Sequence, residues 1–265
     1  MTPSAEFLNP LKPDFKFDPR RAQELLQQGL IDESDTAFLQ NLANESAVSP
    51  EVVQAVYDYR MLVGNDFRPG QDLFIRMQKL GLKNHPLTGL DISGYNLPSV
   101  DLSNASIDGD LNMRKTVVDK DVNQTGMNVR NIYQLKMKAE IVHQQGMKAA
   151  YVDQSEMKAE HIDQSGMEAD HVDQSGMEAR SIDQSGMKVR YVDQHRMDVG
   201  YVDQSGMRAE IVDQQRMRAG YVDQHRMDAG HVDQQKMKAE IVRQPGMKAK
   251  SVNQEGMDVK KIIKD

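Results

Sequence analysis

The sequence predicts a two-domain α+β protein, in which a small α-helical bundle precedes a β-solenoid of about 20 residues per coil. Segments with helix-capping residues occur within 18–86. A ten-residue repeat then runs from Val122 to Lys261. Between them, residues 90–109 carry a period of five residues. Periods of five and ten residues are typical of a chain that coils, because each copy then occupies an equivalent place in the stack.

Composition and charge change along the chain, which supports the division into two domains. The net charge of the 265 residues is −7, divided into −6 for residues 1–121 and −1 for residues 122–265. There is no cysteine and no tryptophan. Disulfides, cysteine-based zinc sites and a cysteine nucleophile are therefore excluded, and stability must come from packing.

We expect the protein to be cytoplasmic, or exported without a cleaved signal peptide. No run of about 18 apolar residues occurs, so no membrane span is expected. The N-terminus also lacks a basic segment followed by an apolar one, as a cleaved signal peptide requires.

The N-terminal part divides into a leader and a helical domain. Residues 1–17 contain three prolines and no periodicity, which predicts an extended leader. Four helices are expected in 18–86, and Asp18, Ser34 and Ser49 are placed to cap the first three. Short connections between helices are typical of a small bundle.

Residues 90–109 consist of four pentads, "LDISG YNLPS VDLSN ASIDG". A large apolar residue occupies the third place of each pentad, at Ile92, Leu97, Leu102 and Ile107. With Asp91, Asn96 and Asp101 in the preceding place, the stretch resembles the pentapeptide-repeat family. The resemblance implies a right-handed, four-sided β-helix with one pentad per side, beginning within 87–121.

The ten-residue repeat has four nearly constant columns. Methionine and glutamine each recur in all fourteen copies, from Met127 to Met257 and from Gln124 to Gln254, with Ala or Val two residues after Met and Val or Ile two before Gln. Spacings of two, three, two and three residues leave any helical face within two copies, whereas a strand alternates at two. We therefore expect Met-x-Ala and Val-x-Gln to form two short strands with both ends pointing inward.

Each copy then contributes two sides, so that about 20 residues close one coil and residues 122–262 form the decapeptide-repeat solenoid. About seven coils stacked at roughly 4.8 Å give a rod of about 34 Å. Gly166, Gly176 and Gly186 stand at corners that require positive φ. The glutamines are expected to form a structural ladder along the core, because buried amides must be hydrogen-bonded.

The pentads and the decads differ in phase by two residues. The apolar residue that ends an inward pair at Ile92 and Leu97 begins a pair at Val122 and Met127. We therefore expect a bulge or irregular loop within 111–122.

Outward positions are the candidates for function. Aspartate lies between Val and Gln in nine copies, from Asp153 to Asp233. A column of like charges is unfavourable, and basic residues such as Lys148, Lys158 and Lys188 are expected to offset it. A calcium-binding edge is the less favoured alternative, because calcium sites converge several oxygens on one point.

Tyrosine and histidine share another outward column. The candidate interaction surface consists of these side chains and three aspartates: Tyr151, His161, His171, Tyr191, Tyr201, Tyr221, His231, Asp153, Asp163 and Asp173. Because Ser and Ile also occur in the Tyr/His column, we expect surface rather than metal ligands. No phosphate loop, nucleophile elbow or zinc-protease motif occurs, so neither an enzyme nor a cofactor is expected.

The leading functional hypothesis is a protein-interaction scaffold, since solenoids present extended faces that vary without affecting the core. Uniform repeats without cysteine also favour a bacterial protein, secreted as an effector or acting as an adaptor. Its protein partner is not identified by the sequence.

Two alternatives remain open. The resemblance to pentapeptide-repeat proteins implies a DNA mimic that interacts with gyrase, although a charge of −1 over the repeat is weak for that role. The repeat is also compatible with a fibre or spike element, and with a homo-oligomer. We do not expect the rod to bind DNA.

Overall fold

A computed structural model describes residues 20, 23, 27, 74 and 89–264. The leader predicted at 1–17 and most of the helical domain predicted at 18–86 lie outside the described residues. Phe74 is fully buried and belongs to the same apolar cluster as the solenoid core.

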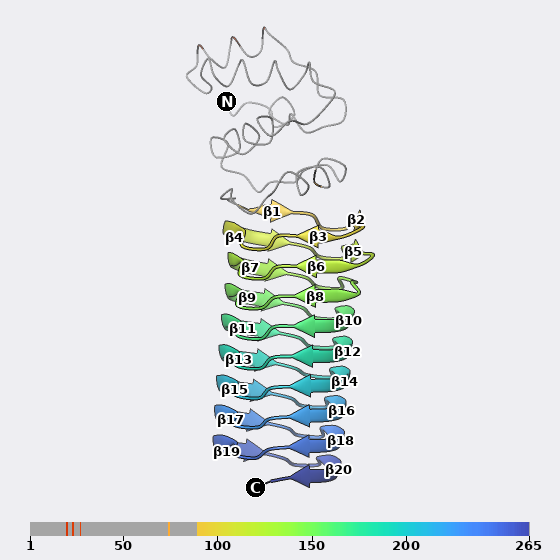
Figure 1. The fold of residues 1–265 in the computed structure, drawn as a ribbon, viewed down its shortest axis with the longest axis vertical. Helices are drawn as coiled ribbons and strands as arrows, with labels where there is room; N and C mark the ends of the chain where they lie inside the picture. The colour runs from red at the N-terminus through yellow and green to blue at the C-terminus, as the bar shows by residue number, and fades with distance from the viewer. Residues whose placement is uncertain (1–19, 21–22, 24–26, 28–73, 75–88, 265) are drawn as a thin grey trace.

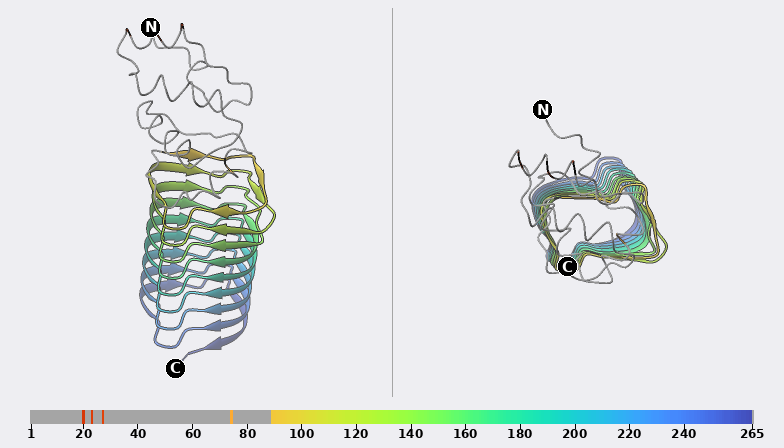
Figure 2. Two further views of the ribbon diagram at one scale, coloured as in Figure 1. Left: turned by 45° about the horizontal axis from the view of Figure 1, so that its top comes forward. Right: turned by 90° about the horizontal axis from the view of Figure 1, so that it is seen from above.

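Residues 90–263 form a β-solenoid in which two parallel sheets face each other across the core (Figures 1 and 2). Each sheet has nine strands, and a pair formed by β2 and β5 adds a short third side near the start. Seen from above, successive coils lie nearly over one another around a closed outline (Figure 2). The predicted β-solenoid is confirmed.

The two nine-stranded sheets are called sheet A and sheet B. The strands of sheet A, in stacking order, are β1 (Leu90–Asp91), β4 (Ser106–Asn112), β7 (Asn128–Tyr133), β9 (Lys148–Asp153), β11 (Glu168–Asp173), β13 (Lys188–Asp193), β15 (Arg208–Asp213), β17 (Asp228–Asp233) and β19 (Lys248–Asn253). Those of sheet B are β3 (Val100–Asp101), β6 (Asp121–Asn123), β8 (Ile141–His143), β10 (Lys158–Asp163), β12 (Glu178–Asp183), β14 (Asp198–Asp203), β16 (Arg218–Asp223), β18 (Lys238–Arg243) and β20 (Asp258–Ile263). The short pair is β2 (Asn96–Leu97) and β5 (Val117–Val118).

Two copies of the repeat close one coil through the decapeptide region, as the sequence predicts. Ala169 pairs with Ala149 on one side and with Val189 on the other, so that each partner lies two copies away along the chain. The predicted pair of three-residue strands is wrong in one respect. Each decad forms one strand, usually of six residues, because the chain bends at its third residue, such as Asp170, without leaving the sheet.

The other corner is a tight turn that follows each strand. Gly166, Gly176 and Gly186 have φ of 65°, 66° and 64°, which confirms the expected left-handed corner. The same conformation occurs in copies without glycine, for example at Arg196 with φ of 57°.

The phase shift between pentads and decads is absorbed at two places. Between β4 and β7 the register shifts, so that three residue steps from Ile107 to Asp110 face two steps from Val129 to Asn131. A second extra residue lies between Val117 and Asp121. Val117 pairs with Lys138 and Asp121 pairs with Ile141, so that four residue steps face three. The second irregularity lies within the predicted segment 111–122, whereas the bulge precedes it.

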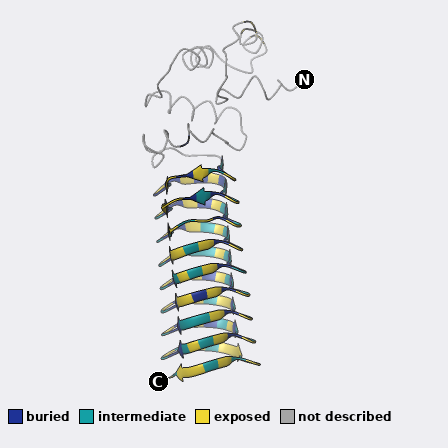
Figure 3. Cartoon of the chain, turned by 90° about the vertical axis from the view of Figure 1, so that its right-hand side faces the viewer, coloured by how far each residue is buried: buried dark blue, intermediate teal, exposed yellow. Residues whose placement is uncertain are grey.

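The core consists of stacked methionine, valine or isoleucine, and glutamine side chains. Met127 through Met237 are completely buried at every tenth residue, and Val152, Val172 and Val192 are equally inaccessible. The strands that face the viewer in Figure 3 are mostly exposed or half-buried, and in β12 such residues alternate before the buried Ile182. Flexible methionines fill the repeat core, in which no aromatic side chain recurs, because their thioethers adapt to irregular gaps.

The glutamines form a continuous network rather than two separate ladders. Gln184 Nε2 donates to Oε1 of Gln174 at 2.8 Å and of Gln164 at 3.1 Å. Its own Oε1 accepts from Gln194 at 2.8 Å and from Gln204 at 3.1 Å. Each interior amide thus joins its own sheet and the opposite one, so the buried polar groups are satisfied.

Candidate interaction surface

Part of the predicted surface forms a stack of rings on sheet A. The ring centroids of Tyr133 and Tyr151 lie 6.0 Å apart, those of Tyr151 and His171 5.2 Å, and those of His171 and Tyr191 4.7 Å. The guanidinium of Arg114 covers the ring of Tyr133 at 4.0 Å. Because rings at these distances interact favourably, the column is itself a stabilising feature.

The remaining rings do not join this stack. Tyr201 and Tyr221 stack on sheet B with centroids 5.3 Å apart. His161 and His231 each lie 2.6 Å from a serine hydroxyl, Ser181 on sheet B and Ser251 on sheet A. The ten predicted surface residues are therefore divided between two faces of the rod, with Tyr151, His171, Tyr191, His231, Asp153 and Asp173 on sheet A and His161, Tyr201, Tyr221 and Asp163 on sheet B.

Three surface tyrosines, Tyr151, Tyr191 and Tyr201, have raised pKa values. Burial, reinforced by the carboxylates of Asp153 and Asp173, raises the pKa of Tyr151 to about 12. Burial followed by neighbouring aspartates also raises the pKa values of Tyr191 and Tyr201. Both effects disfavour a phenolate.

The aspartate column serves the turns. In all nine copies from Asp153 to Asp233, Oδ1 accepts a hydrogen bond from the backbone N–H two residues later, as Asp183 does from Ser185 at 2.8 Å. This local bond stabilises the tight corner. The column is also partly buried, and burial together with Asp193 and Asp233 raises the pKa of Asp213.

The expected pairing of lysines with this aspartate column is wrong. Lys148 and Lys188 both pair with Glu168, at 3.4 and 2.8 Å, and Lys158 pairs with Glu178 at 2.7 Å. These pairs join equivalent positions two copies apart, which lie side by side on adjacent coils. Arg243 makes the one ion pair found with this column in residues 89–264, to Asp223 at 2.9 Å.

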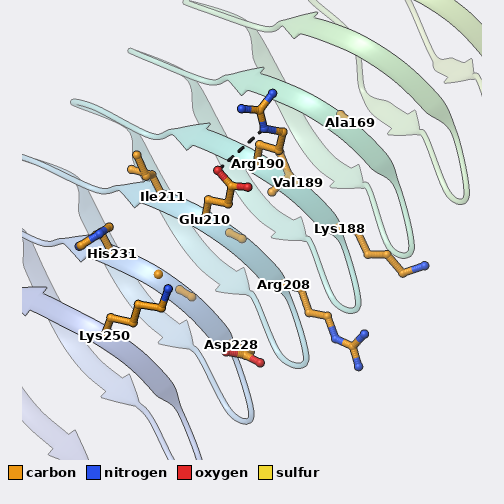
Figure 4. A pocket seen from close by; sticks show the side chains of 13 residues that line it. Ala169, Lys188, Val189, Arg190, Arg208, Glu210, Ile211, Asp228, His231 and Lys250 are labelled. Atoms are coloured by element: carbon orange, nitrogen blue, oxygen red, sulfur yellow. Dashed lines mark ion pairs between the residues drawn. The ribbon is translucent and has the colours of Figure 1, made fainter.

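Sheet A carries a shallow groove, which we call groove A (Figure 4). It has a volume of about 750 Å³ and a floor that includes Ala169, Val189, Ala209 and Ala229. Four basic and two acidic side chains line it: Lys188, Arg190, Arg208, Lys250, Glu210 and Asp228. Arg190 and Glu210 point toward one another at 3.8 Å, and Ile211 at the rim is 39% exposed.

Sheet B carries an equivalent groove, which we call groove B. Its volume is about 590 Å³, and three basic and three acidic residues line it: Lys138, Lys158, Arg180, Glu160, Glu178 and Asp198. The two grooves share a backbone geometry but differ in charge. Outward substitutions therefore give the two faces different surfaces on the same scaffold.

Neither a metal centre nor a membrane helix is found in the described part of the chain. Within residues 20, 23, 27, 74 and 89–264, no group of three His, Cys, Asp or Glu side chains is placed to hold a metal ion. No described helix is long and apolar enough to cross a membrane.

Two surface features were missed by the sequence reasoning. The ring stack begins at Tyr133, which occupies the aspartate column and not the Tyr/His column. Its signal was the substitution itself, an aromatic residue where nine later copies have aspartate. The grooves lie where the spacing predicts a corner between Met-x-Ala and Val-x-Gln, but no groove was expected there.

Comparisons do not assign the chain to a known group. No family model, no curated protein and no solved structure matches it.

Proposed function

We propose that this protein is a non-enzymatic interaction scaffold, a rod whose outward side chains bind protein partners. The observation that carries the proposal is the contrast between constant inward columns and variable outward ones. At the bend of sheet A, Arg190, Glu210, Gly230 and Lys250 occupy equivalent positions on consecutive coils and line one groove. A surface of this kind can change its specificity without changing its core.

The charge pattern supports a protein partner over DNA mimicry. Acidic side chains are paired along the rod, as in Lys158–Glu178, Lys188–Glu168 and Lys260–Glu240. A mimic of duplex DNA requires a strongly negative field, which these pairs reduce. We also infer a right-handed coil, from the resemblance to pentapeptide repeats and from the strong preference of parallel crossovers for that hand.

Site-specific photo-crosslinking tests the proposal. A photoreactive residue replaces Ile211 on sheet A or Tyr201 on sheet B in the full chain, both 39% exposed. We expect a discrete protein to be captured from cell lysate by one face and not by the other. Identical capture by both faces, or none by either, contradicts the scaffold, and recovery of gyrase favours the DNA-mimic alternative.

A further inference from the structure

One edge of the rod carries a line of cations at positions where the backbone favours glycine. The turn after each sheet A strand contains one residue with positive φ. In stacking order these residues are Gly94, Lys115, Lys136, Glu156, Gly176, Arg196, Arg216, Lys236 and Gly256. Lys136 pairs with Glu156 on this edge at 3.4 Å. Arg196, Arg216 and Lys236 follow one another on adjacent coils, and we call these three residues the cationic ridge.

The opposite edge has the same turn and serves as an internal comparison. Its positive-φ residues, in order, are Asn104, Gly126, Gly146, Gly166, Gly186, Gly206, Arg226 and Gly246. Glycine thus occupies six of eight places on this edge and three of nine on the other. The geometry of the turn alone does not account for the difference.

Cations on the ridge are unfavourable for the fold in two ways. Arg196, Arg216 and Lys236 have φ of 57°, 57° and 58°, in a region that residues with a Cβ adopt at a cost. They also follow one another on adjacent coils, roughly 4.8 Å apart, where like charges repel. Within residues 89–264, no carboxylate lies within 4.0 Å of their charged groups.

A need to neutralise the negative charge of the aspartate column does not explain these cations. On the opposite edge, Asp163, Asp183 and Asp203 form an equivalent column and precede turns that contain glycine. Strain that the fold does not need is typical of positions with another role.

We propose that the cationic ridge docks an extended acidic peptide segment of a partner protein. This inference rests on the proposed function of the rod as a scaffold and identifies the chemistry of one partner. The three cations stand at equivalent turns of consecutive coils, which lie nearly over one another (Figure 2). An extended chain lying along the ridge places a carboxylate within reach of each long basic side chain.

A narrow occupant fits better than a broad polyanion. Asp193, Asp213 and Asp233 lie three residues before the three consecutive cations, so a carboxylate column runs beside the ridge. A duplex nucleic acid wide enough to cover both columns meets repulsion from these carboxylates. A single peptide chain contacts the cations alone.

The test uses the full chain and a labelled oligo-glutamate peptide, with binding followed by fluorescence anisotropy. The variant Arg196→Gly/Arg216→Gly/Lys236→Gly is expected to bind about tenfold more weakly or worse. Its thermal midpoint should be unchanged or higher, because glycine adopts positive φ without strain. The control Arg180→Gln/Arg218→Gln/Lys238→Gln removes the same charge elsewhere and should retain binding.

Three outcomes overturn the inference: no binding by the unaltered protein, equal loss in both triple variants, or tighter ridge-dependent binding of a duplex oligonucleotide. Photo-crosslinking with the triple-glycine variant separates the two proposals. If the same partner is captured undiminished, the scaffold function stands and the ridge inference fails.

Discussion

The side-chain amide of Gln184 lies 2.8 Å from Oε1 of Gln174, which is ten residues earlier and follows β11 in the opposite sheet. The bond crosses the coil, so the glutamines tie the two sheets together through the centre of the core. Stability should therefore depend on the interior glutamines more than on any single surface pair.

Replacing Gln184 by leucine should lower the free energy of unfolding by about 2–6 kcal/mol. The change leaves one amide N–H of Gln194 and one of Gln204 without an acceptor, and each buried orphan costs about 1–3 kcal/mol. Urea unfolding followed by circular dichroism measures the loss. Gln254→Leu is the control, because this half-buried amide donates to Gln234 at the end of the described coils. Equal losses in both variants would contradict a cooperative network.

In the turns, adding a side chain at a glycine should lower the free energy of unfolding, and removing one at a residue with positive φ should raise it. Gly186→Ala should cost about 1 kcal/mol, because a Cβ at φ of 64° is strained although no atom lies within 4 Å of it. Arg226→Gly on the same edge should gain up to about 1 kcal/mol by relieving that strain. Thermal unfolding of the two variants checks the signs, and a stabilising Gly186→Ala would refute the argument.

Asp213→Asn should stabilise the protein at neutral pH by less than about 1 kcal/mol, since the site is partly solvated. The folded-state pKa of Asp213 is raised by burial and by Asp193 and Asp233. Asp213 therefore contributes to stability at pH values below its pKa in the unfolded protein. This contribution is lost as the pH rises through its pKa in the folded protein. Asparagine keeps the turn, as Asn123 does with Thr125.

The measurement for Asp213 is chemical unfolding at acid and neutral pH. The advantage of the asparagine variant should vanish where Asp213 is protonated. A gain of the same size at both pH values would show that charge is not its origin.

Tyr151 should ionise with a pKa of about 12. Because this pKa is raised above its ordinary value of 10.0, stability is retained below pH 10.0 and lost as pH rises toward 12. The difference in ultraviolet titration between the protein and Tyr151→Phe isolates this group. Asp153→Asn keeps the turn acceptor and should lower the pKa, whereas an ordinary pKa in the unaltered protein would contradict its burial.

The inward columns were predictable because their spacing has a direct physical meaning. Met187, Val192 and Gln194 recur with the two-and-three spacing of strands and corners, and all three are completely buried. A corner between Ala169 and Val172 was expected from the spacing, but the continuation of one strand through it was not, since the repeat does not distinguish a turn from a corner that keeps its sheet bonds. The hydrogen bond between Gln184 and Gln174 depends on the width of the coil, which periodicity does not contain.

The candidate surface was predictable only in part. That Tyr151 and His171 become neighbours follows from a coil made of two copies of the repeat. The role of Asp153 as a turn acceptor depends on local backbone geometry, and the pairing of Lys188 with Glu168 depends on which side chains share a column. Composition and charge therefore could not predict either the turn hydrogen bond of Asp153 or the ion pair of Lys188.

The glutamine network also has a direction. Every interior amide donates toward earlier coils and accepts from later ones, as Gln164, Gln174 and Gln184 do in succession. Their dipoles consequently add along the axis, as peptide dipoles add along an α-helix. The glutamine network is therefore electrically polar, with its negative pole toward the last described coil, where Lys260, Lys261 and Lys264 lie.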